Sequence, residues 1–291
     1  MLLLQALAFI TAALASNLPK PQAKCNGYAE LCDRKYSNIT FIGTHNSAFE
    51  KSSHFVRGNQ GITVTQQLNL GVRFLQAPMH FHRGRGRMCH ADCFLLDEGP
   101  VTDYLQEISD WLARNPAEVV TLLLTNRDRI LMEETDAEFE QTGLKKLVYN
   151  PPHRLAKDHW PTLQELISKG KRLVVFMDAW TDQRKVPYVL PQWDYFWETH
   201  WGELDPEFPR CDVDRPGGGN PDKLMGIMNH MLYYSEWCGA VKGSHPSAAS
   251  YVNSKQSIMK HVELCKSRQG KVPNVILTLS NMGMPWKFNG S

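Results

Sequence analysis

The sequence predicts a single α/β domain built as a TIM-type (β/α)8 barrel, either regular or distorted. From residue 39 onward, short apolar runs rich in β-branched residues alternate with longer amphipathic stretches, which is typical of βα units around a parallel sheet. The apolar runs are too hydrophobic to be half exposed, as expected of strands that helices cover. A length of 291 residues with 42% hydrophobic residues is enough for one large core.

The strands and helices follow from this alternation in chain order. Six apolar runs predict strands, at residues 39–43, 72–77, 119–125, 172–178, 224–231 and 274–280. A helix is expected over 102–115, where five apolar side chains share one face: Tyr104, Leu105, Ile108, Trp111 and Leu112. A second helix, over 162–169, begins at Thr162 with Glu165 three residues on and ends before Gly170. A third is expected over 248–268.

The start of the chain predicts export. Residues 1–15 form an apolar stretch that ends in Ala13-Leu14-Ala15, which fits the small residues required for signal-peptide cleavage before Ser16. We therefore expect a signal peptide at 1–15, a disulfide-bearing segment at 16–38 and the barrel at 39–291. No other run approaches the ~18 apolar residues that cross a bilayer. The expected protein is secreted, extracellular and monomeric.

Seven cysteines in an exported chain suggest disulfide bonds. Cys25 with Cys32, and Cys89 with Cys93, lie close enough in sequence to close local loops. The competing interpretation of Cys89 and Cys93 is a metal site with His90, but no second Cys/His pair has finger-like spacing. The other three cysteines leave one odd thiol, and their pairing stays open: Cys211, Cys238 and Cys265.

Two histidines follow predicted strands at the edge where parallel barrels carry their active sites. His45 comes directly after the first strand, in Gly43-Thr44-His45-Asn46-Ser47. His90 follows the second strand, beyond the basic segment 80–87. An imidazole with a pKa near 6.5 suits both halves of acid–base catalysis at a phosphodiester, so the pair predicts an acid and a base at the barrel mouth.

Several motifs in one order carry a resemblance to a known family. They are Phe41-Ile-Gly-Thr-His-Asn46, Gln67-Leu-Asn-Leu-Gly-Val-Arg-Phe-Leu75, Asn115-Pro-x-Glu-Val-Val-Thr-Leu-Leu-Leu124, Trp160-Pro-Thr-Leu-Gln-Glu165, Gly170-Lys-Arg-Leu-Val-Val-Phe-Met-Asp178 and Ile227-Met-Asn-His230. Over roughly residues 25–285 the chain resembles the X-type catalytic region of phosphatidylinositol-specific phospholipases C. It is most similar to secreted phospholipase-C-like phosphodiesterases of fungi.

The resemblance implies that His45 is a general base and His90 a general acid. Calcium-dependent members carry carboxylates on the second strand, where this chain has Leu75-Gln-Ala-Pro78. Of that ligand set only Asn46 remains, and Asn126 replaces a further acidic position. Because hard cations need several oxygen ligands, we expect no metal and no other cofactor, although weak Ca²⁺ or Mg²⁺ binding stays open.

The metal-free members place an arginine on the second strand, at the position of Pro78 here. We therefore expect Arg83, Arg85 or Arg87 to bind the phosphate, because guanidinium groups bind it in bidentate fashion. The alternative is a solvated basic loop.

Four further residues at strand ends complete the predicted site. Asp178 ends its strand and is the best remaining carboxylate for the mouth, against a capping or salt-bridge role. Asn126 ends the third strand, and Asn229 and His230 end another, from which strand alternation turns one inward. We expect contacts from these residues to the substrate headgroup.

The predicted function is a secreted phosphoric diester hydrolase or lyase that acts on a phospholipid or glycerophosphodiester without metal and touches a membrane surface transiently. One alternative is a catalytically impaired barrel that binds a phosphate-bearing lipid or glycan, because the usual acid on the last strand is missing. The other is a metal-assisted lyase like the sphingomyelinase-D toxins, which would need a carboxylate cluster. A net charge of +2 gives no reason to expect nucleic acid.

Two sequons could be glycosylated after export, Asn38-Ile39-Thr40 and Asn289-Gly290-Ser291. Asn38 adjoins the first predicted strand, so it could be hidden.

Overall fold

The fold is a curled sheet of parallel strands with helices outside it, seen in the computed structural model, which describes residues 23–50, 58–235, 241–244 and 248–279. Within these residues the parallel strands pair in the order β7-β6-β5-β2-β1-β12-β9-β8. Their bounds are β1 (Phe41–Thr44), β2 (Phe74–His82), β5 (Val120–Asn126), β6 (Leu173–Met177), β7 (Val189–Pro191), β8 (Phe196–Glu198), β9 (Met225–Asn229) and β12 (Val275–Thr278). The expected TIM-type barrel is confirmed in a distorted form.

The distortion lies between β7 and β8. Across the described residues no ladder joins these two strands, so the sheet stays open there. They follow each other in the chain, connected by the single turn of α6 (Gln192–Tyr195), which is too short for a helix that covers the sheet. The result is a half-barrel whose strands all point their carboxyl ends to one side, which we call the mouth.

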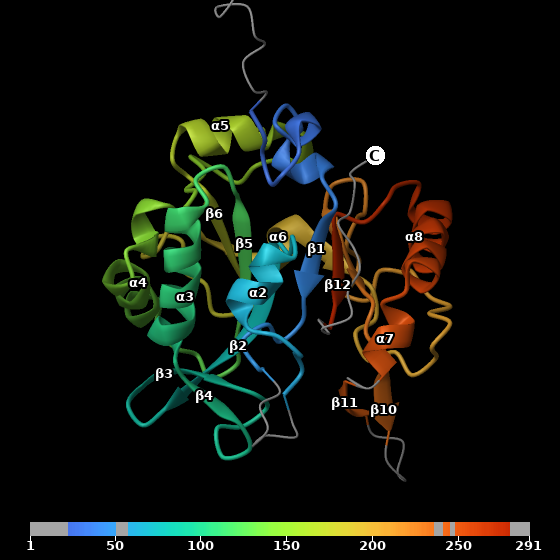
Figure 1. Ribbon diagram of the computed structural model, residues 1–291, viewed down its shortest axis with the longest axis horizontal. Helices are drawn as coiled ribbons and strands as arrows, with labels where there is room; N and C mark the ends of the chain where they lie inside the picture. Colours follow the sequence, from blue (N-terminus) through green and yellow to red (C-terminus); the bar gives the residue numbers. More distant parts are fainter. Residues whose placement is uncertain (1–22, 51–57, 236–240, 245–247, 280–291) are drawn as a thin grey trace, which may run out of the picture.

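Helices pack on the outside of the sheet (Figure 1). The longer ones are α3 (Val101–Arg114), α4 (Met132–Gln141) and α8 (Lys255–Gln269), and the shorter ones are α2 (Val64–Asn69), α5 (Leu163–Ser168) and α7 (Ala249–Val252). Single 3-10 turns occur at η2 (Ala29–Leu31), η3 (Tyr36–Asn38), η4 (Leu144–Lys146) and η5 (Lys157–His159). No helix in the described part of the chain is both long and apolar enough to cross a membrane.

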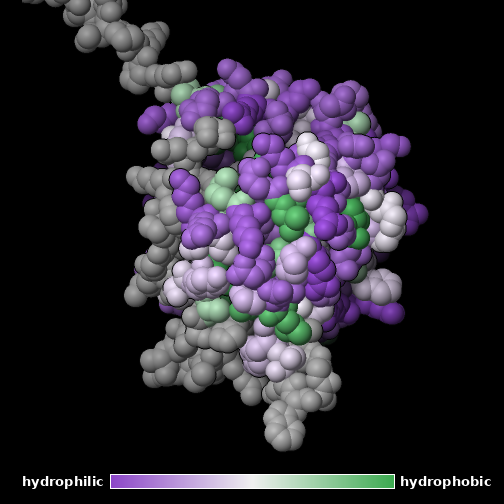
Figure 2. Space-filling model, turned by 90° about the vertical axis from the view of Figure 1, so that its right-hand side faces the viewer, coloured by the Kyte–Doolittle hydropathy of each residue, from purple (hydrophilic) through white to green (hydrophobic). Residues whose placement is uncertain are grey.

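The outer face of the helical layer is polar. Figure 2 views the molecule from the side that carries α7 and α8, and this face is largely hydrophilic, with apolar residues in small separate spots. Inside, the apolar side chains of β2, β5 and β6 are buried against α3, whose Leu105, Ile108 and Leu112 are inaccessible to solvent. This division between faces is what keeps the helices on the sheet.

Two antiparallel hairpins extend the mouth (Figure 1). β2 continues beyond the barrel and pairs with β3 (Arg85–Cys89), which pairs with β4 (Asp97–Pro100). On the other side of the mouth, β10 (Tyr233–Ser235) pairs with β11 (Val241–Ser244). These hairpins hold residues that approach the strand ends from outside the barrel.

Three disulfide bonds join described cysteines: Cys25–Cys32, Cys89–Cys93 and Cys211–Cys265. The first two match the predicted local loops, and the metal interpretation of Cys89 and Cys93 is wrong because both sulfurs are oxidised. The third resolves a pairing that spacing left open. Cys238, like the predicted signal peptide and the sequon at Asn289, lies outside the described residues.

The elements that the sequence predicts are present in the structure, with one helix divided in two, and the structure adds strands and helices that were not predicted. All six predicted strands and the helices at 102–115 and 162–169 are present, the latter with a capping box between Thr162 and Glu165. The helix expected over 248–268 is in fact two, α7 and α8, because the Ser254 hydroxyl caps α8 by accepting from the Ser257 N–H. The strands β7 and β8 were missed because each has three residues.

Candidate active site

His45 stands at the carboxyl end of β1, in the centre of the mouth. Its backbone N–H donates to the Thr278 carbonyl on β12 at 2.8 Å, which continues the ladder past the last paired residue. The ring is hydrogen-bonded by the Gln76 side chain from β2, and its Nε2 lies 3.2 Å from the hydroxyl of Tyr233 on β10. Two polar side chains from different strands therefore fix the orientation of the imidazole.

The surroundings of His45 favour its neutral form. Burial lowers the pKa of His45 to about 3, and the positive charges of His90 and Arg215 act in the same direction, while the hydrogen bond with Gln76 opposes them. At neutral pH the ring is therefore uncharged, as a general base must be. A bound phosphodiester anion would raise this pKa, because a negative charge favours the protonated ring.

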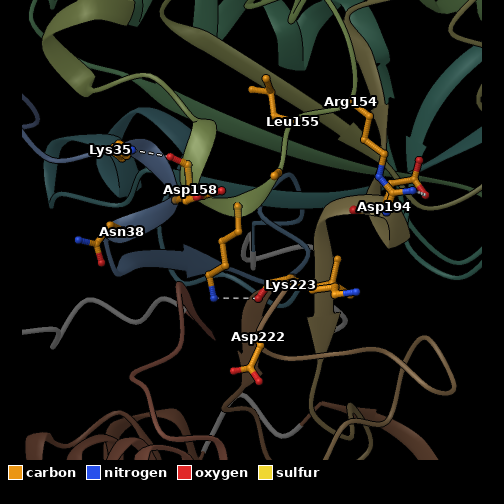
Figure 3. Close-up of a pocket in the computed structure, with 12 residues that line it drawn as sticks. Lys35, Asn38, Arg154, Leu155, Asp158, Asp194, Asp222 and Lys223 are labelled. Atoms are coloured by element: carbon orange, nitrogen blue, oxygen red, sulfur yellow. Dashed lines mark hydrogen bonds and ion pairs between the residues drawn. The ribbon is translucent and has the colours of Figure 1, made fainter.

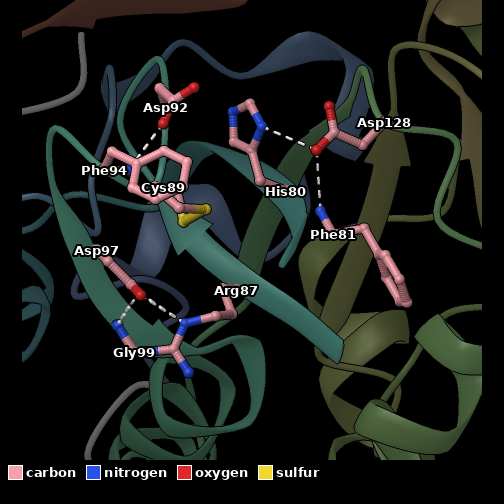
Figure 4. The surroundings of a disulfide bond; sticks show 10 residues. His80, Phe81, Arg87, Cys89, Asp92, Phe94, Asp97, Gly99 and Asp128 are labelled. Carbon is pink, nitrogen blue, oxygen red and sulfur yellow. Dashed lines mark hydrogen bonds and ion pairs between the residues drawn. A yellow bond between two sulfur atoms is a disulfide. The ribbon is translucent and has the colours of Figure 1, made fainter. Parts of the chain in front are cut away.

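His90 lies in a tight loop between β3 and β4. The disulfide bond between Cys89 and Cys93 closes this loop, and Figure 4 shows it at the end of β3. The His90 N–H donates to the Leu96 carbonyl at 3.0 Å, and its carbonyl accepts from Asp92 N–H at 2.7 Å. These bonds anchor the backbone on both sides of the ring.

The side chain of His90 turns toward the segment that follows β1. Its ring packs against Phe49, with ring centroids 5.2 Å apart. The charge of His90 lowers the pKa of His45, so the two imidazoles lie near enough for one to act on the other. The structure therefore brings together the two histidines that the sequence singled out.

Asn46 shapes the turn that follows His45. Its backbone has φ +55°, a left-handed conformation that asparagine adopts more readily than most residues. Its N–H donates to Gln76 Oε1 at 3.0 Å, so one strand-two amide binds both the ring of His45 and the next peptide group. Gln76 thus helps to orient both the His45 ring and the turn that follows it.

Asp178 reaches the mouth, whereas the Asn126 side chain does not. Asp178 follows β6, and its carboxylate accepts a hydrogen bond from the Asn126 N–H at 2.8 Å. Burial raises the pKa of Asp178, while this hydrogen bond and the positive charges of Arg127 and Arg215 lower it. The Asn126 amide donates to the Ile130 carbonyl at 3.0 Å and accepts the Ile130 N–H at 2.8 Å. Asn126 therefore holds the loop after β5 and is not counted as a substrate contact.

Arg215 is the mouth residue that the sequence did not reveal. Its segment pairs with the end of β8, where the Glu198 N–H donates to the Arg215 carbonyl at 2.8 Å. The guanidinium forms an ion pair with the Glu198 carboxylate and lies over the Trp193 ring, 5.3 Å from its centroid. Its charge also lowers the pKa values of His45, Asp178, Glu198 and Tyr233, so the guanidinium lies near enough to act on all four groups.

Asn229 supports this ion pair from the neighbouring strand. Its Nδ2 donates to the Thr199 carbonyl at 2.7 Å and to Glu198 Oε2 at 3.4 Å, and the residue is buried. Burial raises the pKa of Glu198, and the hydrogen bond from Asn229 and the charge of Arg215 both oppose that rise. The predicted headgroup contact of Asn229 is thus replaced by a role in positioning the carboxylate that holds Arg215.

His230 points away from the mouth. Its ring is fully buried and stacked on Phe208, with centroids 4.0 Å apart. Nδ1 lies 2.9 Å from Nδ1 of His261, and Nε2 lies 2.8 Å from the Val252 carbonyl. Both ring nitrogens are occupied within the core, so His230 has no atom to offer a substrate and is no longer a candidate.

The three arginines of the basic segment lie on a hairpin and not in a loop that folds over the strands. Arg83 and Gly84 form the turn between β2 and β3, both with positive φ, and Arg83 and Arg85 are exposed. Arg87 forms an ion pair with Asp97 on β4, with Nε 2.6 Å from a carboxylate oxygen (Figure 4). The charge of Arg87 is thus already matched, and Arg83 and Arg85 stand at the rim.

The comparisons with known proteins agree with this architecture. The family model described as PI-PLC X 1 matches residues 31–285. The chain is 42% identical over 259 residues to PI-PLC X domain-containing protein 1 of the fungus Arthroderma benhamiae, covering 87% of this chain and 83% of that protein. It is also 42% identical over 228 residues to an uncharacterized secreted protein of that fungus, covering 76% of this chain and 51% of the relative.

Solved structures show the same fold at low sequence identity. The phosphatidylinositol-specific phospholipase C of Listeria monocytogenes superposes with a TM-score of 0.59 at 14% identity, over 86% of this chain and 91% of that one. A phosphatidylinositol-specific phospholipase C of Staphylococcus aureus gives a TM-score of 0.57 at 16% identity, over 88% and 90%. From the family match and the fungal relatives, the chain belongs to the PI-PLC X domain family.

Proposed function

We propose that this protein is a secreted phosphodiesterase that cleaves a phospholipid or a glycerophosphodiester with His45 as general base and His90 as general acid. The observation that carries the proposal is that the charges of the loop-held His90 and of the Arg215 guanidinium both act on a neutral His45 at the mouth. A base, an acid and a cation are the three groups that displacement at a phosphodiester needs.

The proton transfers follow from these positions. His45 takes the proton from the attacking hydroxyl or water as the new phosphorus–oxygen bond forms. His90 gives a proton to the leaving oxygen as its bond to phosphorus breaks. Arg215 lies beside the charge that develops on the phosphate, and its guanidinium can donate two parallel hydrogen bonds to the phosphate oxygens.

The residue types at the mouth suit a mechanism without a bound metal ion. Gln76 and Pro78 occupy the strand-two positions of acidic ligands, and Glu198 is committed to Arg215. In the described part of the chain, the one group of three metal-ligating residues that lie together is Cys211, His261 and Cys265, whose two cysteines form a disulfide bond. A metal-assisted lyase would need a carboxylate cluster, so we place that alternative last.

The rim of the mouth suits a lipid surface. Large apolar side chains that follow the strand ends or lie on the hairpins are exposed: Phe81, Phe94, Leu95, Trp180, Trp201 and Tyr234. Phe94 is the extreme case, with 86% of its surface accessible, only four residues after His90. Aromatic rings are favoured at the boundary between lipid and water, so we propose that the rim contacts the membrane while the mouth takes a headgroup.

Export is part of the proposal. The three disulfide bonds fit an oxidising compartment, and one of the fungal relatives is described as a secreted protein. The apolar stretch at residues 1–15 supplies a signal for that route.

One observation favours binding without turnover as the second candidate. His45 is oriented by Gln76 and approached by Tyr233, and no carboxylate of the described residues is hydrogen-bonded to its ring. An imidazole without an acidic partner is a weaker base. A barrel of this kind would hold a phosphate-bearing lipid or glycan through Arg215 and release no product.

A headgroup-release assay separates these candidates. Phosphatidylinositol, lysophospholipid, sphingomyelin and glycerophosphodiester substrates are incubated with the parent, with His45→Ala and with His159→Ala, an exposed histidine that serves as the matched control. We expect chelator-resistant release by the parent and by H159A, and none by H45A. Equal release by the parent and H45A would refute the proposed base, and no release from any substrate would favour the binding function.

A further inference from the structure

We propose that Asn38 carries an N-linked glycan, and that the first sugars of this glycan lie against a polar cleft at the closed end of the barrel. Asn38 begins the sequence Asn38-Ile39-Thr40, which has the pattern of an acceptor site. The proposal goes beyond the phosphodiesterase activity but rests on the proposed export, because glycans are transferred to asparagine side chains in the secretory pathway.

Asn38 is accessible to solvent although it adjoins the first strand. Asn38 is the last residue of η3, and its side chain is exposed, whereas its neighbours Ser37 and Ile39 are buried. Figure 3 shows the Asn38 amide pointing away from the other labelled side chains. Within the described residues this amide makes no hydrogen bond, so a sugar attached to Nδ2 displaces no native contact.

The backbone around Asn38 is nevertheless firmly held. The Asn38 N–H donates to the Lys35 carbonyl at 2.8 Å, and the Thr40 hydroxyl donates to the Pro273 carbonyl at 2.8 Å. The Asn274 side chain donates to the Ser37 carbonyl at 2.7 Å. The attachment point is thus a fixed position on the surface, at the edge of the cleft that Asn38 helps to line.

A cleft of about 920 Å³ opens beside this position, with Asn38 among its lining residues. Charged groups of both signs line it, including Lys35, Arg154, Lys157, Asp158, Asp222 and Lys223. Figure 3 shows Asp158 near Asn38 and the pair Asp222 and Lys223 farther along the wall. Sugar hydroxyl groups both donate and accept hydrogen bonds, so a wall with donors and acceptors matches the inner residues of a glycan.

The cleft lies at the opposite end of the barrel from the mouth. Asn38 precedes β1 and His45 follows it, so the six residues between them separate the two sites by about 20 Å of extended chain. Figure 1 shows the amino-terminal turns at one end of the molecule and the hairpins of the mouth at the other. A glycan on Asn38 therefore leaves the mouth open to a lipid surface.

The chemistry of the transfer balances with a lipid-linked pyrophosphate oligosaccharide as the donor. Asn38 Nδ2 forms a bond with C1 of the first sugar, and the bond from C1 to the pyrophosphate oxygen breaks. The lipid pyrophosphate leaves, and the amide gives up one proton. The product is a neutral amide, so the charge of the protein at this site does not change.

Peptide mapping of the protein secreted by a fungal host tests the attachment. Enzymatic release of an N-glycan converts its asparagine to aspartate, so the mass of the peptide that contains residue 38 reports its occupancy. We expect conversion in the parent, in Thr40→Ser and in Asn289→Gln, and none in Thr40→Ala. Thr40→Ser keeps the hydroxyl that both the acceptor site and the Pro273 contact need, so it is the matched control for Thr40→Ala. Unmodified Asn38 in parent protein recovered from the medium would overturn the proposal while leaving export intact; parent protein that stays in the cell would overturn both.

Native deglycosylation tests the contact with the cleft. The double variant Asp222→Ala with Lys223→Ala removes two exposed polar groups from the wall of the cleft. We expect enzymatic release of the glycan from the folded variant to become up to about tenfold faster, which is equivalent to the loss of about one net hydrogen bond. The control pair Asp182→Ala with Arg184→Ala removes an ion pair between a half-buried aspartate and an exposed arginine, both outside the lining residues of this cleft, and should leave the rate unchanged. Equal rates for both pairs would show that the sugars do not lie against the cleft.

Discussion

Replacement of Arg215 by glutamine removes the guanidinium that stands among the mouth residues. Two opposite charges about 4 Å apart interact by about 4 kcal/mol at an effective dielectric constant of 20. The Arg215 side chain is 43% exposed, so solvent screening reduces its contact with a phosphate to about 1.5–3 kcal/mol, the range of a hydrogen bond between charged groups. If the contact strengthens in the transition state, Arg215→Gln should lower kcat/KM by roughly 10- to 150-fold.

The same replacement also leaves Glu198 without its partner. Because the Glu198 side chain is only 6% exposed, an unpaired carboxylate there should cost about 1–3 kcal/mol of folding free energy. The double variant Arg215→Gln with Glu198→Gln removes both charges and should regain most of that stability. It should not regain activity, since the phosphate still lacks its cation.

Thermal unfolding and headgroup release, measured on the parent, R215Q, E198Q and the double variant, separate these two effects. Activity of R215Q within about twofold of the parent would refute the role of Arg215 at the phosphate. Activity that returns together with stability in the double variant would show that Arg215 acts only by neutralising Glu198.

Three further perturbations follow from the same geometry. The unfolded state binds a proton at His45 below pH 6.5, whereas the folded state does not until about pH 3, so the contribution of His45 to stability is full above pH 6.5 and falls as the pH drops. In urea titrations of His45→Gln between pH 4 and 6, the free energy of unfolding should therefore change with pH by about 1 kcal/mol per pH unit less than in the parent. An unchanged slope would contradict this. Cys89→Ser with Cys93→Ser opens the loop of His90 and should lower kcat by roughly tenfold or more with little change in KM, whereas an unchanged kcat would mean that the disulfide does not position the ring. Phe94→Ser should weaken sedimentation with phospholipid vesicles by about 10- to 100-fold but leave hydrolysis of a soluble glycerophosphodiester unchanged, and equal vesicle binding would remove Phe94 from the membrane contact.

The elements that the sequence predicts well are those with a strong local signal. The strand β6 reads Leu-Val-Val-Phe-Met and is buried at every residue, so its hydrophobic run is unambiguous. The strands β7 and β8 have three residues each, too few for any periodicity. Their pairing depends on tertiary contacts that local propensity does not encode.

The candidate site divides in the same way. His45 and His90 were found because each follows a predicted strand on one side of the barrel, where the topology brings them together. Arg215 escaped because it lies in an irregular segment whose position depends on pairing with the short strand β8. The position of His230 was predicted wrongly because strand alternation says that successive side chains point in opposite directions, but not which of them points toward the mouth. In the structure the neighbouring helix α8 supplies His261 as a partner for the His230 ring.

The central claim is that His45 and His90 form an acid–base pair, and the dependence of headgroup release on the leaving group tests it most directly. Parent, His45→Ala and His90→Ala are assayed on phosphatidylinositol with chelator present, first with the natural leaving group and then with a p-nitrophenol leaving group that needs no protonation. We predict that H45A is inactive on both substrates, whereas H90A is inactive on the first and retains most of its activity on the second. Equal loss for H90A on both substrates, or turnover by H45A at the parent rate, would contradict the account.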